Sequence, residues 1–229
     1  MKKPIYQINN LSYSKNNNTI LNIKNFEIHR GTCYMISGSM GSGKSLLLNI
    51  LSKKIKNYNG DVLFNQNNLK QISNKNFLTE TALVPQISSI PFFKSTETYI
   101  KNEIAKRHND ATFDKKFKNI VTNMDLKHLL DKKMRKLTPS QFRWVDLASK
   151  IASYPKLLFI DELELHLSKK NLISLSKILY RKCNYDGVTL IATTQNPEMF
   201  TNLTSVNISL NQGRITKVRS FSHRSKKKR

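Results

Sequence analysis

Hydrophobic and polar residues alternate along two segments near the start of the chain, residues 5–14 and 20–28. This period of two is typical of half-buried strands, with one slip of phase in the second segment. Short, mostly apolar runs predict further strands at residues 32–36, 61–64, 82–84, 156–160 and 188–193. Apolar residues at helical spacing predict helices at residues 45–54 and 169–182. Strands that alternate with helices in this way indicate an α/β fold with parallel strands.

The middle and the end of the chain show two other patterns. From about residue 86 to 136 the apolar spacing is helical, and the loops carry many charges. Residues 206–210 and 214–218 are strand-like and flank the turn Asn211-Gln212-Gly213, so they predict a terminal hairpin. The sequence has no internal repeat and no true linker, and we expect one domain over residues 1–218.

Composition indicates a globular protein. Hydrophobic residues are 38% and charged residues 24% of the 229 residues, which suits one domain with a substantial core. The sequence contains no run of about 18 apolar residues, so no segment can span a bilayer by itself. The basic start lacks an apolar run behind it, which argues against a secretory signal. Two cysteines indicate no disulfide framework, and a cytosolic setting fits best.

The formal net charge of +24 is spread along the chain, because lysine is abundant in helices, loops and turns alike. Its concentrated part is the tail at residues 219–229, which we interpret as disordered and solvated. Contact with anionic lipid is the next interpretation, since each basic residue near such a surface contributes about 1 kcal/mol. Nucleic acid comes last as a partner, because the tail lacks interleaved aromatic residues that stack on bases.

One glycine-rich segment carries a specific motif between the predicted strand at 32–36 and the predicted helix at 45–54. It fits G-x-x-x-x-G-K-[ST] at each fixed position. Glycines let successive backbone N–H groups turn toward phosphate oxygens, and the following helix directs its positive end at them. We expect the lysine to reach the β- and γ-phosphates and the last serine to ligate Mg²⁺. The residues are Gly38, Ser39, Met40, Gly41, Ser42, Gly43, Lys44 and Ser45.

Two carboxylates, Asp161 and Glu162, follow the predicted strand at residues 156–160. They would stand at the mouth of a parallel sheet, where α/β folds bind their ligands. Asp161 would hold Mg²⁺ through water, and Glu162 would polarise the attacking water. Strands often end in acids, so the pair is a weak signal alone. Together with the phosphate loop, at this separation, it becomes a strong one.

The two elements and their spacing resemble the ATP-binding cassette family of transporter ATPases, over nearly the whole chain. The resemblance implies a P-loop NTPase fold with a mixed sheet core and an N-terminal antiparallel β subdomain. It also implies an α-helical subdomain inserted at about residues 88–150. In that family, Tyr13 would stack on adenine, and Gln86 would contact Mg²⁺ and the attacking water. An ordinary strand aromatic and a plain loop glutamine are the alternatives for these two residues.

The family's signature, Leu-Ser-Gly-Gly-Gln, aligns with Leu137, Thr138, Pro139, Ser140 and Gln141. In such proteins two cassettes sandwich ATP head to tail, and each signature caps the γ-phosphate bound by the other cassette. Thr138 keeps a hydroxyl, but Pro139 lacks a backbone N–H and Ser140 adds a side chain. The segment still predicts a helix start, with Thr138 as N-cap and Gln141 completing a capping box. We expect the local structure to survive while the phosphate contact weakens.

Two further residues depart from the family pattern. Gln195 stands where the family has a switch histidine, and its amide can bind a γ-phosphate or water but cannot change protonation. Ser168 stands where the family has an aspartate that couples the two ATP sites. We interpret the nearby His166 as a dimer-surface or helix-start residue rather than as a replacement for that aspartate.

The resemblance implies an ATP-binding subunit that binds ATP and Mg²⁺ in the cytoplasm, at the inner face of a membrane. It would drive transport through a separate integral membrane permease, with a coupling surface at about residues 88–136, and pair with a second cassette subunit. With altered capping residues, we expect slow hydrolysis by a homodimer and better hydrolysis in a heterodimer with an intact partner. The alternative is a non-transport cassette that acts as an ATP-gated clamp or assembly factor; a purely regulatory subunit is a weaker third interpretation.

Overall fold

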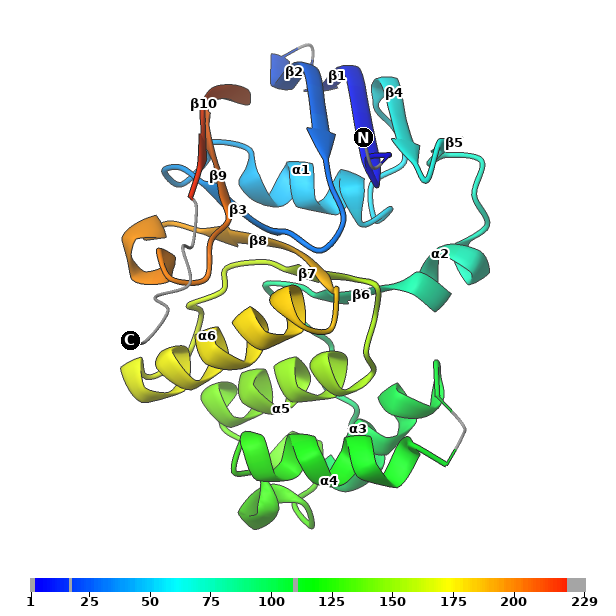
Figure 1. Cartoon of the computed structure of the whole chain (residues 1–229), viewed down its shortest axis with the longest axis vertical. Coiled ribbons are helices and arrows are strands. Elements are labelled where there is room, and N and C mark those ends of the chain that lie inside the picture. Colours follow the sequence, from blue (N-terminus) through cyan, green and yellow to red (C-terminus); the bar gives the residue numbers. More distant parts are fainter. Residues whose placement is uncertain (1–2, 17, 109–110, 222–229) are drawn as a thin grey trace, which may run out of the picture.

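A six-stranded sheet lies at the centre of the computed structural model, which describes residues 3–16, 18–108 and 111–221 (Figure 1). Its strands are β3 (Cys33–Ser37), β6 (Thr81–Val84), β7 (Leu157–Ile160), β8 (Thr189–Thr194), β9 (Val206–Asn211) and β10 (Arg214–Ser220). The strand order is β10-β9-β3-β8-β7-β6. The pairs from β9 to β6 are parallel and β10 is antiparallel to β9, so the predicted mixed α/β sheet is confirmed.

A second, antiparallel sheet forms the layer at the top of Figure 1. Its order is β2-β1-β4-β5, with β1 (Tyr6–Lys15), β2 (Asn18–Ile28), β4 (Asn59–Phe64) and β5 (Asn67–Asn68). Helix α1 (Lys44–Leu51) lies between the two sheets and packs against both (Figure 1). The alternation in β1 and β2 puts apolar side chains toward this helix, as their period of two requires. The shared core includes Ile8, Leu11, Leu21, Ile36, Leu48, Phe159 and Ile191.

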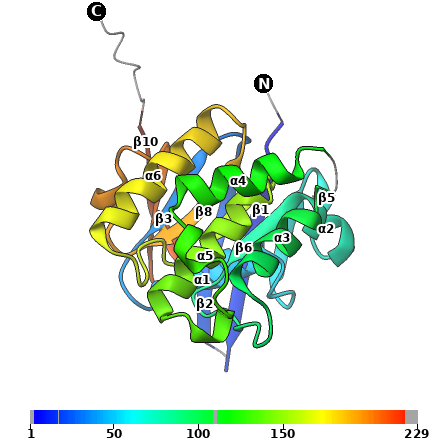
Figure 2. The same cartoon turned by 90° about the horizontal axis from the view of Figure 1, so that it is seen from below.

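Helices cover the other face of the central sheet. The pair α5 (Pro139–Ala152) and α6 (Lys169–Asn184) packs next to the strands, and α3 (Thr96–Ala105) and α4 (Phe113–Asn123) pack beyond α5, as Figure 2 shows from below. The Trp144 Nε1–H donates to the Met124 carbonyl at 2.8 Å, which ties α5 to the end of α4. Short 3-10 helices lie at Lys127–Leu129, Met134–Lys136 and Pro197–Phe200. Within the described ranges, no helix is long and apolar enough to cross a bilayer.

Two small elements occur where the sequence pattern predicts none. These are β5 and the helix α2 (Asn74–Glu80), in a stretch rich in asparagine. Helix α2 buries only Phe77, so it has no amphipathic period long enough to detect. Its start is fixed locally, because Ser73 caps the helix by accepting from the Asn76 N–H at 3.1 Å.

The expected start of the tail at residue 219 is wrong. Arg219 and Ser220 continue β10, where they pair with Asn207 and Val206. The Phe221 N–H also donates to the Ser205 carbonyl at 2.8 Å. The hairpin continues because pairing satisfies the hydrogen bonds of these backbone groups. The basic side chain of Arg219 stays exposed on the edge strand, so pairing does not bury its charge. The rest of the expected tail, residues 222–229, lies outside the described residues.

Candidate functional site

The glycine-rich segment forms a loop from the end of β3 to the start of α1. Gly41 and Gly43 adopt φ angles of 78° and 99°, a conformation that favours glycine. Lys44 is buried, and its ammonium folds back over the loop: Nζ donates to the carbonyl oxygens of Gly38 at 2.7 Å and Ser39 at 2.8 Å. The loop therefore surrounds a positive charge that two carbonyl oxygens accept from. The oxygens of a bound anion can take the place of these carbonyl oxygens.

The start of α1 offers hydrogen-bond donors to a ligand. Gly43 is the N-cap, so no side chain caps the helix, and its first turn carries no acid. Ser42 Oγ is buried and has no hydrogen-bond partner among the described residues. The Met40 side chain is 84% exposed at the tip of the loop, so it does not cover these donors. Free donors at the positive end of a helix bind anions, so the loop fits phosphate groups.

The turn between β9 and β10 supports the loop from the side, a role that the sequence does not reveal. The Gly213 N–H donates to the Ser42 carbonyl at 3.0 Å, and the Gly213 carbonyl accepts from the Asn22 N–H of β2 at 2.8 Å. A Cβ atom at Gly213 would lie 2.0 Å from the Ile20 carbonyl oxygen. Only glycine therefore fits here, and the terminal hairpin fixes the phosphate loop against the N-terminal sheet.

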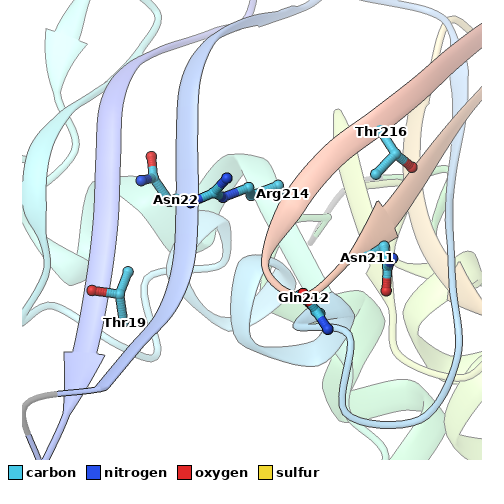
Figure 3. Close-up of a pocket in the computed structure, with 6 residues that line it drawn as sticks. All are labelled: Thr19, Asn22, Asn211, Gln212, Arg214 and Thr216. Carbon is cyan, nitrogen blue, oxygen red and sulfur yellow. The ribbon is translucent and has the colours of Figure 1, made fainter.

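A polar hollow of about 580 Å³ lies between β2 and this hairpin (Figure 3). In Figure 3, the Arg214 side chain extends from β10 toward Asn22 on β2. None of the predicted site residues lines the hollow, so it is separate from the phosphate loop. Its lining is Thr19, Asn22, Asn211, Gln212, Arg214 and Thr216.

Asp161 meets the phosphate loop at the carboxyl end of β7. The Ser45 hydroxyl donates to Asp161 Oδ1 at 2.9 Å, and the Thr193 hydroxyl of β8 donates to the same oxygen at 2.6 Å. Asp161 is 3% exposed. A buried carboxylate that accepts two hydroxyl groups is held in one orientation. The hydroxyl and carboxylate oxygens of Ser45 and Asp161 form a donor set of the kind that Mg²⁺ prefers.

Glu162 follows at a strained backbone position, with a φ of 48°. Its N–H donates to the Thr193 hydroxyl at 2.7 Å, which stabilises this turn. Its carboxylate is half-buried, and Oε1 accepts from Gln195 Nε2 at 3.3 Å. The structure thus brings together Glu162 and Gln195, which lie 33 residues apart in the sequence.

Gln86 lies exposed just after β6, the neighbour of β7 in the sheet. Arg143 of α5, which belongs to none of the predicted motifs, links the ends of these two strands. Its guanidinium donates to the carbonyls of Pro85 at 2.6 Å, Asp161 at 2.6 Å and Glu162 at 3.0 Å. Burial lowers the pKa of Arg143, although four carboxylates around it oppose that shift. A charged residue on the buried face of a predicted helix is the signal that could have identified it.

Tyr13 is half-buried at the edge of the core around α1. It pairs with Leu21 of β2, and Leu21 Cδ1 lies 3.4 Å from the position that a Cβ of Gly43 would occupy. Tyr13 is therefore one strand away from the phosphate loop, on the side of the N-terminal sheet.

The predicted signature segment lies at the exposed start of α5. Thr138 is the N-cap: its hydroxyl accepts from the Gln141 N–H at 3.3 Å, and Gln141 Oε1 accepts from the Thr138 N–H at 3.1 Å. Pro139 occupies the first helical position, and Ser140 is half-buried beside it. The predicted capping box is confirmed. The side chains of Thr138 and Gln141 thus bond within the segment, and Thr138 and Pro139 are exposed to a partner.

Ser168 is the N-cap of α6, where its hydroxyl accepts from the Asn171 N–H at 3.2 Å. His166 is exposed two residues earlier and has a φ of 59°. This position is exposed and close to the start of α6, as expected for a surface or helix-start residue. Ser168 thus has a local structural role that is independent of any coupling between sites.

These parts combine an anion-binding loop, the oxygens of the hydrogen-bonded pair Ser45 and Asp161, and the second carboxylate of Glu162 at the carboxyl ends of the strands. Lys44 and the start of α1 can bind phosphate groups, and Ser45 with Asp161 can hold a hard cation. Glu162 is beside them and can accept a proton from water. The arrangement can therefore bind a nucleoside triphosphate and hydrolyse its terminal phosphate.

Comparison with protein families supports this interpretation. A family described as ABC transporter matches residues 21–164, which is more than half of the chain. The match begins in β2 and ends just beyond Glu162, so it includes the phosphate loop and both carboxylates.

Curated relatives and a solved structure agree with this match. The cytochrome c biogenesis ATP-binding export protein CcmA of Reclinomonas americana is 25% identical over 191 residues, 81% of this chain and 83% of the relative. The energy-coupling factor transporter ATP-binding protein EcfA of Malacoplasma penetrans (strain HF-2) is 27% identical over 221 residues, 93% of this chain and 75% of the relative. The dimeric ATP-binding cassette MJ0796, in a post-hydrolysis state with ADP and Pi, matches with a TM-score of 0.81 and 18% identity, over 96% of this chain and 100% of that chain.

Proposed function

The chain belongs to the ABC transporter family as an ATP-binding subunit, and on that premise we propose that it couples the binding and hydrolysis of Mg-ATP to transport through a separate membrane permease. One observation carries the proposal. The Ser45 hydroxyl at the end of the phosphate loop donates to Asp161, 116 residues further along the chain, at 2.9 Å. This contact joins the phosphate site to the carboxylates, which is what phosphoryl transfer requires.

Each residue of the proposed site has a distinct role. Lys44 and the backbone donors of the loop bind the phosphates, with Gly38, Ser39, Met40, Gly41, Ser42 and Gly43 forming the cradle. Ser45, Asp161 and Gln86 would hold Mg²⁺, which would supply positive charge to the phosphate oxygens. Glu162 accepts a proton from the attacking water, and Gln195 orients that carboxylate. Tyr13 stacks on adenine beside the loop.

We place the permease contact at a groove of about 870 Å³ between the end of β6 and helix α3. Its rim continues into the segment after Gln86, which exposes large apolar side chains: Ile87 at 87%, Phe92 at 57% and Phe93 at 86%. Clustered apolar exposure of this kind marks contact surfaces. Basic groups in the lining outnumber acidic ones, so we expect an apolar segment with acidic residues as the occupant; the charged lining residues are Lys54, Lys75, Lys106, Arg107, Lys150, Glu103 and Asp146.

We propose a second cassette subunit as the other partner. The exposed start of α5 at Thr138 would face the ATP bound by that subunit, as in the head-to-tail arrangement of the family. Pro139 offers no N–H and Ser140 adds bulk, so a partner with an intact signature would complete the site at Lys44 better than a second copy would. This arrangement puts the subunit at the cytoplasmic face of the membrane, attached through the permease.

Co-purification from detergent-solubilised membranes tests the proposed function. The full chain should retain an integral membrane protein, and Phe93→Asp in the exposed segment should abolish that retention. Val218→Asp, at a position 46% exposed on β10, is the matched control and should retain the membrane protein. Capture of nucleic acid that is lost at moderate salt, with no membrane protein, would contradict the proposal and favour an ATP-gated clamp.

A further inference from the structure

Glu164 is a third carboxylate close to the site, in the turn that follows β7. Its Oε1 accepts two hydrogen bonds from the end of β8: from the Thr194 hydroxyl at 2.9 Å and from the Gln195 backbone N–H at 2.8 Å. The Thr194 hydroxyl also accepts from the Asn196 N–H at 2.9 Å. One carboxylate oxygen thereby fixes three successive residues, 194–196, through two direct bonds and one relayed bond.

The segment that Glu164 fixes carries the side chain that contacts the proposed base. Gln195 Nε2 donates to Glu162 Oε1 at 3.3 Å. The two turns are also joined by a backbone bond from the Leu163 N–H to the Thr193 carbonyl at 3.0 Å. The direction in which Gln195 leaves the backbone is thus set by its N–H bond to Glu164, and its amide then reaches Glu162.

The other oxygen of Glu164 adds weight to this interpretation. Oε2 is buried and has no hydrogen-bond partner among the described residues. An unpaired buried carboxylate oxygen costs stability. The nearby charge of Arg143 offsets part of this cost, and the two bonds to residues 194 and 195 give the glutamate a specific local role.

We propose that Glu164 is a positioning residue for ATP hydrolysis, which acts through Gln195 to orient Glu162. The inference rests on the proposed function, because it takes Glu162 as the base. Within the part of the chain that the structure describes, Glu164 forms no hydrogen bond to the phosphate loop or to Asp161, so it acts on the rate of hydrolysis and not on nucleotide binding. Gln195 does not titrate, so the orientation that it gives to Glu162 does not depend on its own protonation.

Hydrogen exchange tests the first link without reference to activity. In Glu164→Leu, which removes both oxygens and keeps an apolar chain of similar size, the Gln195 amide should exchange about 10-fold faster or more. Glu164→Gln keeps one acceptor oxygen and should restore protection. The control is Glu198→Gln, an equal loss of charge at an exposed position three residues beyond Gln195, and it should change nothing at residue 195. Unchanged exchange in Glu164→Leu would overturn the proposal.

A double-mutant cycle tests the second link. We expect Glu164→Leu to lower kcat for ATP hydrolysis about 10-fold, with KM changed less than about threefold, as for other outer residues that orient a site. Gln195→Ala should lower kcat by a similar factor, and the double variant should lose no more than Gln195→Ala alone. Losses that multiply, or a loss of ATP binding in Glu164→Leu, would overturn the proposal.

The two arms separate this inference from the proposed function. Absence of ATP binding in the wild type would refute the function while exchange at residue 195 still reports on Glu164. Suppose that exchange at residue 195 speeds up in Glu164→Leu as expected, but the losses in kcat of Glu164→Leu and Gln195→Ala multiply in the double variant. This result would refute the route through Gln195 while the proposed function stands.

Discussion

Two regions of the proposed ATPase differ in how their polar groups are satisfied: the phosphate site at the ends of β7 and β8, here the buried half, and the predicted signature at the start of α5, here the exposed half. At the carboxyl ends of β7 and β8, Asp161 and Thr193 are buried and bind residues far away in the sequence. At the start of α5, Thr138 and Gln141 are exposed or half-buried and bind each other across one helical turn. The first region depends on the whole fold, and the second depends on its own five residues.

This difference explains which departures from the family pattern the chain can accept. A change at Asp161 would leave two hydroxyl donors unpaired in a buried site. At the signature, Pro139 and the Thr138 cap keep the helix start intact whatever happens to the phosphate contact. The exposed half can therefore lose its ligand-binding residues at little cost in stability, while the buried half cannot.

The strongest way to break the comparison is to remove the charge at the centre of the buried half. Lys44→Ala should abolish ATP binding, with a loss of roughly 100-fold or more in affinity, because the ammonium is the only long cationic group in the loop. Binding of ATP with Mg²⁺ by calorimetry measures this. Lys56→Ala, an exposed lysine just after α1, is the control and should bind normally. An unchanged affinity in Lys44→Ala would refute the site assignment.

Restoring the family residues in the exposed half, together with the switch histidine at residue 195, should raise the rate. We expect hydrolysis by the isolated wild-type chain to be slow, and Pro139→Gly, Ser140→Gly and Gln195→His together to raise it roughly 10-fold to 100-fold. One positioned oxyanion donor is commonly worth a factor of about 10² to 10³. Phosphate release measures the rate. Brisk turnover by the wild type with no gain in the rebuilt variant would show that the altered cap is not limiting.

The helix that carries the signature is anchored by an ion pair at its other end, and this anchor should depend on pH. Glu103 of α3 accepts from Lys150 of α5 at 2.7 Å and also from Lys106. Burial alone would raise the pKa of Glu103, but the two lysines outweigh it and the net pKa is lowered. The stabilisation is therefore present above the ordinary glutamate pKa, and is lost as the pH falls through the lowered value in the folded state.

Glu103→Gln should accordingly lower the free energy of unfolding by about 1–3 kcal/mol at pH 7. The difference from wild type should shrink below about pH 4, near the ordinary pKa of the group. Urea unfolding at several pH values measures it. Glu97→Gln on the same helix, which breaks an exposed pair with Lys101, should cost about 0.5 kcal/mol or less. An equal and pH-independent loss in both variants would contradict this account.

The smallest effects distinguish capping from coupling. Thr138→Ala removes the N-cap of α5 and should cost about 1 kcal/mol. This corresponds to a fall in Tm of about 2–4 °C for a chain of this size. Ser168→Asp keeps a good N-cap on α6 and should leave Tm unchanged, since aspartate and serine cap helices about equally well. Thermal unfolding measures both, and a large loss in Ser168→Asp would show that Ser168 does more than cap the helix.

Most of the fold could be predicted from the sequence because the buried strands are short apolar runs between amphipathic helices. The exceptions have physical reasons. Helix α2 buries one residue, Phe77, and so has no period to detect. The end of β10 carries Arg219 and Ser220, whose polarity suggests a tail although their backbone is paired. The pattern of hydrophobic and polar residues indicates which side chains are buried. It does not indicate whether the backbone of an exposed strand is paired.

The residue pattern alone predicts the phosphate loop, the two carboxylates after β7 and the cap of α5, because each depends on residues that are adjacent or one helical turn apart. The contacts around them are visible only in the folded chain. Arg143 joins the ends of β6 and β7, Gly213 supports the loop from a distant hairpin, and Glu164 holds Gln195 against Glu162. These contacts join the ends of separate strands and helices, and their partners are set by the order of strands in the sheet, which no local pattern in the chain encodes.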